Sequence, residues 1–453
     1  MAMTTQDGGS QVQPGRSRPL GNRRIGLIVG AALGTGFVVA LALVAVPFIE
    51  AKENVLTGMV LLAFALGWAL LAVLSIRFTD QPQRWAAVPA VFFTVAGLIS
   101  LIGSDAVNSV FGWVWPPLLL GLVVWMIMRA RRQLRSRTRR WLLYPVFAAL
   151  ILASLGGGYE TVAGSIDASR PMPGQLIDIG GHRLHLNCIG SGSPTVVLEP
   201  GLGESSSVMG WITPAVAHDT RVCVYDRAGR GWSEAGDGPQ DGAQTAADLH
   251  TLLDRAHVPG PYVLAGHSFG GLYVLSFAAN YPDQVAGMVL LDSTAPASAP
   301  APPAKTESYD IAGRISALLP AVAHLGVARL YGQFSYGTLP PDSRDEARAR
   351  SGTANDVESF LNEFLEGSIA IHQAASLVDF ADKPLIVLTA GRDHDAAWLA
   401  AQDKLAALST NSRHRIVADA THASLVLDET DAAAASQAIR DVVASVRTSR
   451  PLS

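Results

Sequence analysis

The chain has 453 residues, of which 49% are hydrophobic and only 16% charged, and its formal net charge is −4. This weak net charge, with no basic or aromatic stripe along the chain, argues against a nucleic-acid partner. The sequence has no phosphate-cradling loop and no Cys/His cluster with metal-ligand spacing, so it implies neither a cofactor nor a metal. The apolar excess lies before residue 160, which indicates two parts of different character.

Residues 1–24 are polar and are expected to form a disordered tail. Residues 25–158 contain apolar stretches, each near the roughly 20 residues that a helix needs to cross the hydrocarbon core of a bilayer. A cleaved signal peptide would explain only the first of them. The sequence therefore predicts an all-α transmembrane domain of about five helices, with the lipid bilayer as a partner. The stretches are Ile25–Ile49, Val55–Ile76, Trp85–Ile102, Val110–Met128 and Trp141–Gly158.

The arginines around these stretches predict an orientation. They cluster before the first stretch, between the second and third, and between the fourth and fifth, and the other two loops carry no positive excess. With an odd number of spans, everything after residue 160 is expected on the extracytoplasmic side of a multi-pass protein of the cell membrane. No Asp, Glu, Lys or His lies within the spans, which favours an anchor over a transport pathway.

Residues 159–175 are expected to be a linker and residues 176–446 an α/β domain, because short β-type runs alternate there with helical patterns. Eight such runs predict an eight-stranded, mostly parallel sheet whose first two strands form a hairpin. The runs are Leu176–Ile179, His182–Ile189, Thr195–Glu199, Arg221–Tyr225, Tyr262–Ala265, Gly287–Leu291, Pro384–Thr389 and Arg413–Ala418.

The fifth run leads into a G-x-S-x-G pattern centred on Ser268, and an apolar helical stretch follows it. A tight strand-to-helix turn admits only small residues two positions before and after the serine, here Gly266 and Gly270. A glycine-rich turn before any helix gives the same letters, but the strand before and the helix after favour a nucleophile. Ser268 is therefore the predicted catalytic nucleophile.

Three segments together resemble the α/β-hydrolase superfamily, over nearly all of residues 175–445. They are Gly266-His267-Ser268-Phe269-Gly270-Gly271; Asp226-Arg227-Ala228-Gly229-Arg230-Gly231-Trp232-Ser233, which is similar to a D-x-R-G-x-G-x-S turn with one residue shifted; and Thr421-His422-Ala423-Ser424. The resemblance implies the α/β-hydrolase fold, with a helical cap at about residues 294–380. It implies a serine nucleophile and leaves the substrate open.

In this superfamily the catalytic residues follow the order serine, acid, histidine. His422 comes directly after the last predicted strand, where the family places its histidine, and is the expected general base. His394 and His414 lie elsewhere and are expected at the surface.

The acid has three candidates. Asp393 follows the seventh predicted strand and matches the family position best. Asp292, at the end of the sixth strand, is an alternative used by some relatives, and Asp395 lies two residues beyond Asp393.

Acyl transfer places negative charge on the carbonyl oxygen, so two hydrogen-bond donors must be preset around it. The amide of Phe269, directly after the nucleophile, is one expected donor. The loop after the third strand supplies the other, which the resemblance assigns to the amide of Leu202. Relatives often carry His-Gly-x at this point, whereas this chain has Pro200-Gly201-Leu202.

Cys188 ends the second predicted strand and Cys223 lies near the start of the fourth. The resemblance implies that these strands are antiparallel neighbours, so the two cysteines are expected to be adjacent. Outside the cytoplasm they can form a disulfide. Two buried thiols acting as small apolar side chains are the alternative.

These residues together predict a membrane-anchored serine hydrolase that is esterase- or lipase-like. It would act on a small-molecule or lipid-like acyl substrate through an acyl-enzyme; an amide or peptide substrate is less favoured. Ser268 argues against the relatives that use an aspartate nucleophile. Two alternatives remain: an acyltransferase with the same triad, and a non-catalytic ligand-binding or sensor module on a membrane anchor.

Overall fold

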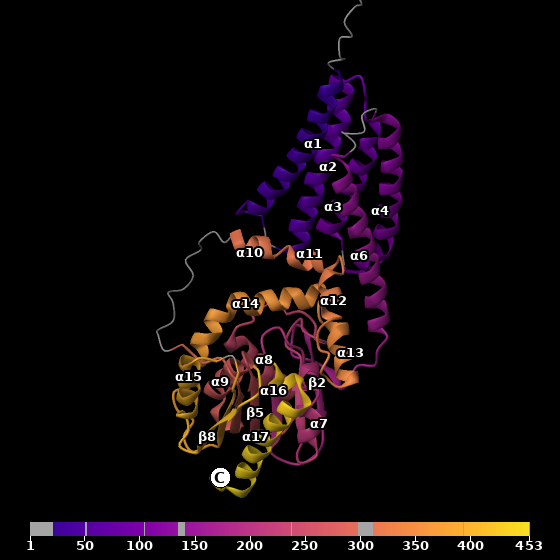
Figure 1. The fold of residues 1–453 in the computed structure, drawn as a ribbon. Coiled ribbons are helices and arrows are strands. Elements are labelled where there is room, and N and C mark those ends of the chain that lie inside the picture. The colour runs from indigo at the N-terminus through magenta and orange to yellow at the C-terminus, as the bar shows by residue number, and fades with distance from the viewer. Residues whose placement is uncertain are drawn as a thin grey trace, which may run out of the picture.

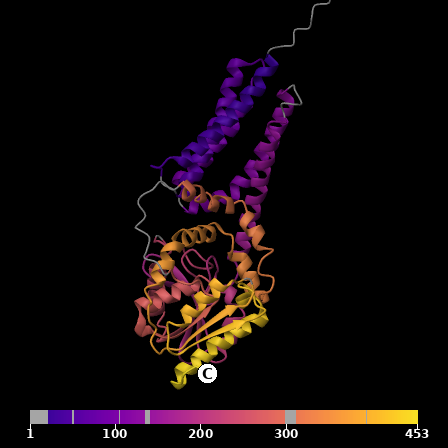
Figure 2. The same cartoon turned by 60° about the vertical axis from the view of Figure 1, so that its left-hand side comes forward.

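The molecule has three layers. A bundle of long helices lies at one end, an α/β domain at the other, and shorter helices lie between them (Figure 1). The same layers are seen after a 60° turn (Figure 2). This computed structural model describes residues 21–49, 52–103, 105–134, 141–236, 238–297, 311–392 and 394–452.

Five helices in the described part of the chain are long and apolar enough to cross a membrane. Large apolar side chains point outward from them, as a lipid-facing surface requires; Leu27, for example, is 73% exposed. The prediction of five apolar N-terminal helices is confirmed. They are α1 (Gly21–Ala45), α2 (Glu53–Phe78), α3 (Ala87–Ile102), α4 (Asp105–Gln133) and α6 (Tyr144–Ala168), with a short 3-10 turn, η1 (Arg84–Ala86), before α3.

The last of these helices is longer than the sequence suggested. Residues 159–175 were expected to be a linker, but α6 continues to Ala168. Its final turns carry Glu160 and Asp167, which both pair with Arg329 from the layer of shorter helices. Because this ion pairing stabilises the added turns, the linker expectation is wrong up to Ala168.

The α/β domain contains one sheet with the strand order β1-β2-β4-β3-β5-β6-β7-β8. The pairs β1–β2 and β2–β4 are antiparallel and the remaining pairs are parallel. The predicted eight-stranded, mostly parallel sheet is confirmed. The strands are β1 (Gln175–Asp178), β2 (Arg183–Ile189), β3 (Thr195–Glu199), β4 (Val222–Tyr225), β5 (Tyr262–His267), β6 (Val285–Leu291), β7 (Leu385–Ala390) and β8 (Ser412–Val417).

Helices cover both faces of the sheet, and each face has its own buried apolar core. Successive strand residues point to opposite faces, so Val197 enters one core and Val196 the other. The first core is closed by α8 (Gly242–Arg255), α9 (Gly270–Asn280) and α15 (Ala396–Ala406), and the second by α7 (Ile212–Ala217), α16 (Ser424–Leu427) and α17 (Glu429–Thr448).

The intermediate layer is the cap expected between β6 and β7. In Figure 1, α14 lies next to the sheet, whereas α10 and α11 lie next to the bundle. Arg314 of α10 donates to the carbonyls of Val44 and Ile49, both at 2.7 Å, and α11 contacts both α2 and α14. The cap therefore joins the bundle to the α/β domain. Its helices are α10 (Ile311–Ser316), α11 (Leu319–Ala323), α12 (Val327–Gly332), α13 (Pro341–Arg350) and α14 (Ala354–Ala374).

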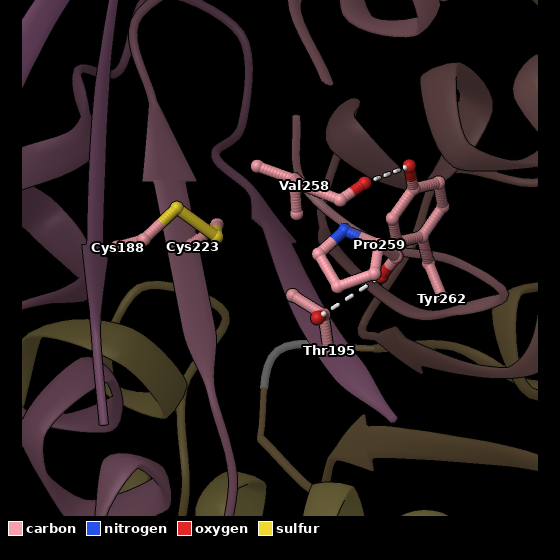
Figure 3. Close-up of a disulfide and its surroundings, with 6 residues drawn as sticks. All are labelled: Cys188, Thr195, Cys223, Val258, Pro259 and Tyr262. Carbon is pink, nitrogen blue, oxygen red and sulfur yellow. Dashed lines mark hydrogen bonds between the residues drawn. A yellow bond between two sulfur atoms is a disulfide. The ribbon is translucent and has the colours of Figure 1, made fainter. Parts of the chain in front are cut away.

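The two cysteines lie opposite each other on β2 and β4. Cys188 and Cys223 are register partners and form a disulfide (Figure 3). Nearby, Thr195 at the start of β3 donates through Oγ1 to the carbonyl of Pro259 at 3.2 Å. Of the two alternatives that the sequence left open, the structure contains the disulfide.

Candidate active site

Ser268 lies at the turn between β5 and α9, with φ at 53°. This left-handed conformation is costly for a residue other than glycine and is typical of functional sites. The flanking glycines permit the turn: a Cβ added at Gly266 would lie 2.6 Å from the carbonyl oxygen of Gly270. The turn has the geometry of a nucleophile elbow, which exposes the serine hydroxyl above the sheet.

His422, in the loop between β8 and α16, lies beside this serine. Its Nε2 is 2.9 Å from the Oγ of Ser268, and its Nδ1 is 2.6 Å from Oδ2 of Asp292. In such a chain the carboxylate orients the imidazole, and the imidazole can accept the proton of the serine. The structure thus brings Ser268 and His422 together with Asp292, the alternative acid at the end of β6.

The Asp292 carboxylate is fully buried and accepts several hydrogen bonds. Besides His422, its donors are Nε2 of His394 at 2.7 Å, Nε1 of Trp398 at 3.1 Å and the amide of Ala390 at 3.3 Å. Burial alone would favour the protonated acid, but the hydrogen bonds from His422, His394 and Trp398 outweigh it and lower the pKa of Asp292. Asp292 is therefore ionised, and its negative charge can stabilise a protonated His422.

Of the other two acid candidates, the structure describes one. Asp393 lies outside the described residues. Asp395 is the N-cap of α15, where its Oδ1 accepts from the amide of Trp398 at 2.8 Å. Asp395 thus stabilises the helix that presents the Trp398 indole to Asp292, which is a structural role.

His394 was expected at the surface, and this expectation is wrong. Its side chain is only 13% exposed, because its ring stacks on Trp398 with 4.6 Å between ring centroids while its Nε2 faces Asp292. No local sequence signal indicates this stacking, because His394 precedes the N-cap of α15 and lies outside the helix. The same expectation is wrong for His414, whose side chain is 15% exposed and whose Nε2 lies 2.8 Å from Oγ1 of Thr389.

Asp292, His394 and His422 also form a group that could hold a metal, since their ligand atoms lie within 4.8 Å of one another. Both imidazoles already face the same carboxylate oxygen, Oδ2. A metal bound here would replace the hydrogen bond by which Asp292 orients His422. Metal binding here would therefore compete with a Ser–His–Asp arrangement.

The two expected oxyanion donors flank the nucleophile. The loop after β3 passes close to the serine, because a Cβ added at Gly201 would lie 3.1 Å from the Cβ of Ser268. Within the part of the chain that the structure describes, the amides of Leu202 and Phe269 donate to no protein acceptor. Both N–H groups therefore remain available for a substrate oxygen.

A buried arginine holds this loop in place. Arg227 donates to the carbonyls of Pro200 and Gly201, at 2.9 and 2.7 Å. It also pairs with Glu199 at 2.6 Å and with Glu363 of α14 at 2.9 Å. One guanidinium thus links the end of β3, the loop and the cap helix.

The pKa values of the two carboxylates in this cluster are shifted in opposite directions. Burial raises the pKa of Glu199 to about 7 despite the nearby guanidinium. Burial also opposes the charge of Glu363, but Arg227 and Arg230 outweigh it and lower the pKa of that group. Glu363 further accepts from the amide of Gly203 at 2.9 Å. Sequence reasoning missed Glu363, because a cap residue 136 positions after Arg227 carries no local signal of this contact.

His267, the residue before the nucleophile, forms a second link to the loop. Its Nδ1 lies 3.2 Å from Oε2 of Glu204, and its Nε2 lies 3.1 Å from the carbonyl oxygen of His422. Burial disfavours the charged ring, but Glu204 outweighs this effect, so the pKa of His267 is raised. Since both ring nitrogens face acceptors, the protonated ring donates to both and holds the backbone of His422 relative to the loop.

The cap presents apolar side chains to the site. The ring of Phe360 is only 2.7 Å from where a Cβ on Gly203 would lie, and it stacks on Phe364 with 6.2 Å between centroids. One helical turn on, Gly367 lies against the ring of Phe269. Phe360 and Phe364 remain 40% and 62% exposed. They can therefore contact an apolar group bound next to Ser268.

The chain is similar to several known proteins. An uncharacterised protein of Schizosaccharomyces pombe is 28% identical over 293 residues, which cover 56% of this chain and 53% of that protein. A putative carbamate hydrolase of Pseudomonas savastanoi pv. phaseolicola is 36% identical over 114 residues, 25% of this chain and 43% of that enzyme. The chain spans about half or less of the length of the curated relatives that it matches.

Among solved structures, the enol-lactonase from Burkholderia xenovorans is 24% identical, with 60% of this chain and all of that chain covered at a TM-score of 0.44. The family model described as the alpha/beta hydrolase fold matches residues 194–429, which is more than half of the sequence. This chain therefore belongs to the α/β-hydrolase fold family.

Proposed function

We propose that the protein is a membrane-anchored serine hydrolase that cleaves an ester, and amides less readily, through an acyl-enzyme. The observation that carries the proposal is the series of hydrogen bonds from Ser268 through His422 to Asp292 at a nucleophile elbow. The unengaged amides of Leu202 and Phe269 support it. The hydrolases among the relatives support the broader class of activity.

Each of these residues has a separate role in the reaction. His422 takes the proton of Ser268 while Oγ bonds to the substrate carbonyl carbon, and the amides of Leu202 and Phe269 donate to the resulting oxyanion. His422 then gives this proton to the leaving alcohol as the ester C–O bond breaks. Water, deprotonated by His422, attacks the acyl-enzyme, and the acid is released as the proton returns to Ser268. Asp292 keeps Nδ1 of His422 protonated and stabilises the imidazolium in both steps.

Two other functions use the same fold. An acyltransferase would use the same residues and differ only in the acceptor, so analysis of the products separates it from a hydrolase. A non-catalytic ligand-binding module needs no activated serine. The complete hydrogen-bonded series at Ser268 favours catalysis over this second alternative.

A fluorophosphonate probe tests the proposal directly. The folded protein in detergent or vesicles should become covalently labelled, since the probe bonds to an activated serine and its oxygen occupies the oxyanion site. Ser268→Ala should abolish labelling. Ser276→Ala, which changes a buried serine within α9, is the matched control and should label as the wild type does. A folded wild-type protein that never labels, or labelling that survives Ser268→Ala, would contradict the mechanism.

We also propose that the hydrolase domain lies on the extracytoplasmic face of the cell membrane. The C-terminal end of α1 contacts the cap, so the N-terminal end of this helix, which carries Arg24, lies at the far end of the bundle from the α/β domain (Figure 1). Arginine-rich loops remain on the cytoplasmic side. The disulfide between Cys188 and Cys223 supports the same side, because such bonds persist in oxidising compartments.

A thiol count checks this assignment. Protein purified and denatured without reductant should show no titratable thiol, and two after reduction, since the sequence contains two cysteines. Two titratable thiols before reduction would contradict both the disulfide and the oxidising compartment.

A further inference from the structure

The outer layer of the cap, residues 311–334, is called the platform here; it rests on the ends of the spanning helices. Arg314, which is buried, donates to the carbonyls of Val44 and Ile49 at the end of α1. The turn between α11 and α12 touches Gly156 of α6. A bilayer that covers the apolar surfaces of α1 and α6 therefore reaches the level of the platform.

Large apolar side chains of the platform recur at helical spacing and remain exposed. The platform contains no Asp or Glu, although it lies on the surface of a chain with 38 acidic residues. Exposed apolar faces without carboxylates are typical of helices that lie in the interfacial layer of a membrane. The side chains, with exposed fractions, are Ile311 (41%), Ile315 (57%), Leu319 (46%) and Val322 (41%) on α10 and α11, and Val327 (56%), Leu330 (55%), Tyr331 (77%) and Phe334 (84%) on and just after α12.

The platform is also continuous with the candidate active site. Its helix α11 packs on α14, the helix that carries Phe360 and Phe364. Phe360 in turn touches Gly203 of the oxyanion loop, and the same helix reaches Phe269. The helices α11 and α14 therefore connect the membrane end of the spans with the immediate surroundings of Ser268.

From this juxtaposition we infer that the platform lies in the interfacial layer of the adjacent leaflet, and that the substrate of Ser268 is a long-chain acyl amphiphile taken from that leaflet. The assignment of the substrate rests on the proposed serine hydrolase, whereas the position of the platform does not. An acyl chain that leaves the bilayer along α11 and α14 contacts apolar side chains. It therefore avoids exposure of its methylene groups to water, which is unfavourable for each of them.

The position of the platform is tested by fluorescence. Full-length protein carrying Ile315→Cys, labelled with the environment-sensitive dye NBD, is reconstituted in phosphatidylcholine vesicles that contain spin-labelled lipid. The native cysteines are bonded to each other, so only the introduced thiol reacts. The dye should be quenched by the spin label. Ile416→Cys on β8, 54% exposed and far from the bundle in Figure 1, is the matched control and should not be quenched. Equal quenching at both positions, or none at 315, would overturn the inference.

The origin of the substrate is tested with two esters: water-soluble p-nitrophenyl butyrate and a fluorogenic oleoyl ester dissolved in the vesicles. Ile315→Glu places a carboxylate in the interfacial layer and should lower turnover of the oleoyl ester by roughly tenfold. Turnover of the soluble ester and fluorophosphonate labelling should not change. Ile416→Glu, the matched control, should affect neither ester.

The outcomes are distinguishable. A variant that cleaves both esters at the wild-type rate, or loses both equally, contradicts the uptake of substrate from the leaflet and leaves the serine hydrolase intact. If the wild-type protein cleaves neither ester and resists labelling, the proposed function fails. The quenching experiment then still decides where the platform lies.

Discussion

Replacing Asp292 by asparagine should lower kcat for ester hydrolysis by about 10⁴-fold, the size of loss known when asparagine replaces the acid of a Ser–His–Asp triad. The asparagine side chain has nearly the same shape, so the fold and KM should change little. In the native protein, Nδ1 of His422 donates to the carboxylate of Asp292. The asparagine amide can instead donate to Nδ1, which favours the tautomer of His422 that carries its proton on Nε2. The imidazole then cannot accept the proton of Ser268. Steady-state kinetics with a soluble ester measures the effect.

Asp393→Asn is the control for this experiment, and it should keep activity within a few-fold of the wild type. Asp395→Asn should also be nearly neutral, because asparagine is as good an N-cap as aspartate. If Asp393→Asn loses activity by orders of magnitude while Asp292→Asn does not, the acid is Asp393, the residue that best matches the family position.

Replacing Arg227 by methionine should lower the free energy of unfolding by roughly 3–5 kcal/mol, since it leaves buried carboxylates without their counter-charge. Glu199 and Glu363 both lose their ion pair to the guanidinium. The carbonyls of Pro200 and Gly201 lose a donor as well, so the oxyanion loop should loosen and kcat should fall by about 10²-fold. Denaturant unfolding in detergent, followed through a signal of the α/β domain, measures the change in stability.

The matched control is Arg392→Met, which removes an arginine whose side chain is 61% exposed and 3.9 Å from its acidic partner. This change should alter the stability by less than about 0.5 kcal/mol. Adding Glu363→Gln to Arg227→Met should recover part of the loss, because one uncompensated charge is removed. A loss below about 1 kcal/mol for Arg227→Met alone would show that the cluster contributes little to stability.

The features that sequence reasoning found are encoded locally. Most of the strands are short runs rich in apolar residues between turn residues, and the elbow around Ser268 needs small residues at fixed offsets. His422 follows the last strand directly, so its position depends on only a few residues. The five spans are recognisable because their length and apolar composition are set by the thickness of the bilayer.

The features that it missed or left open depend on contacts between distant segments. Asp292 and Asp393 each follow a strand whose end points toward the site, and only the packed loops decide which carboxylate meets His422. The contact between Glu363 and Arg227 joins the cap to β4 across a large insertion. The residues next to Glu363 and Arg227 in the sequence give no signal of this contact. The extension of α6 to Ala168 likewise depends on Arg329, which lies in the cap.

The attachment of the cap to the bundle bears on how this protein is best handled in the laboratory. Arg329 and Arg314 are 2% and 7% exposed, and their acceptors in the N-terminal helices are Glu160 and Asp167 of α6 and the carbonyls of Val44 and Ile49 at the end of α1. A soluble truncation that begins at the first strand would keep both guanidiniums and discard every one of these acceptors. In such a fragment the cap above Ser268 would be perturbed, so its substrate preference would differ from that of the intact protein. The N-terminal helices are thus part of the protein's architecture as well as its proposed attachment to a membrane.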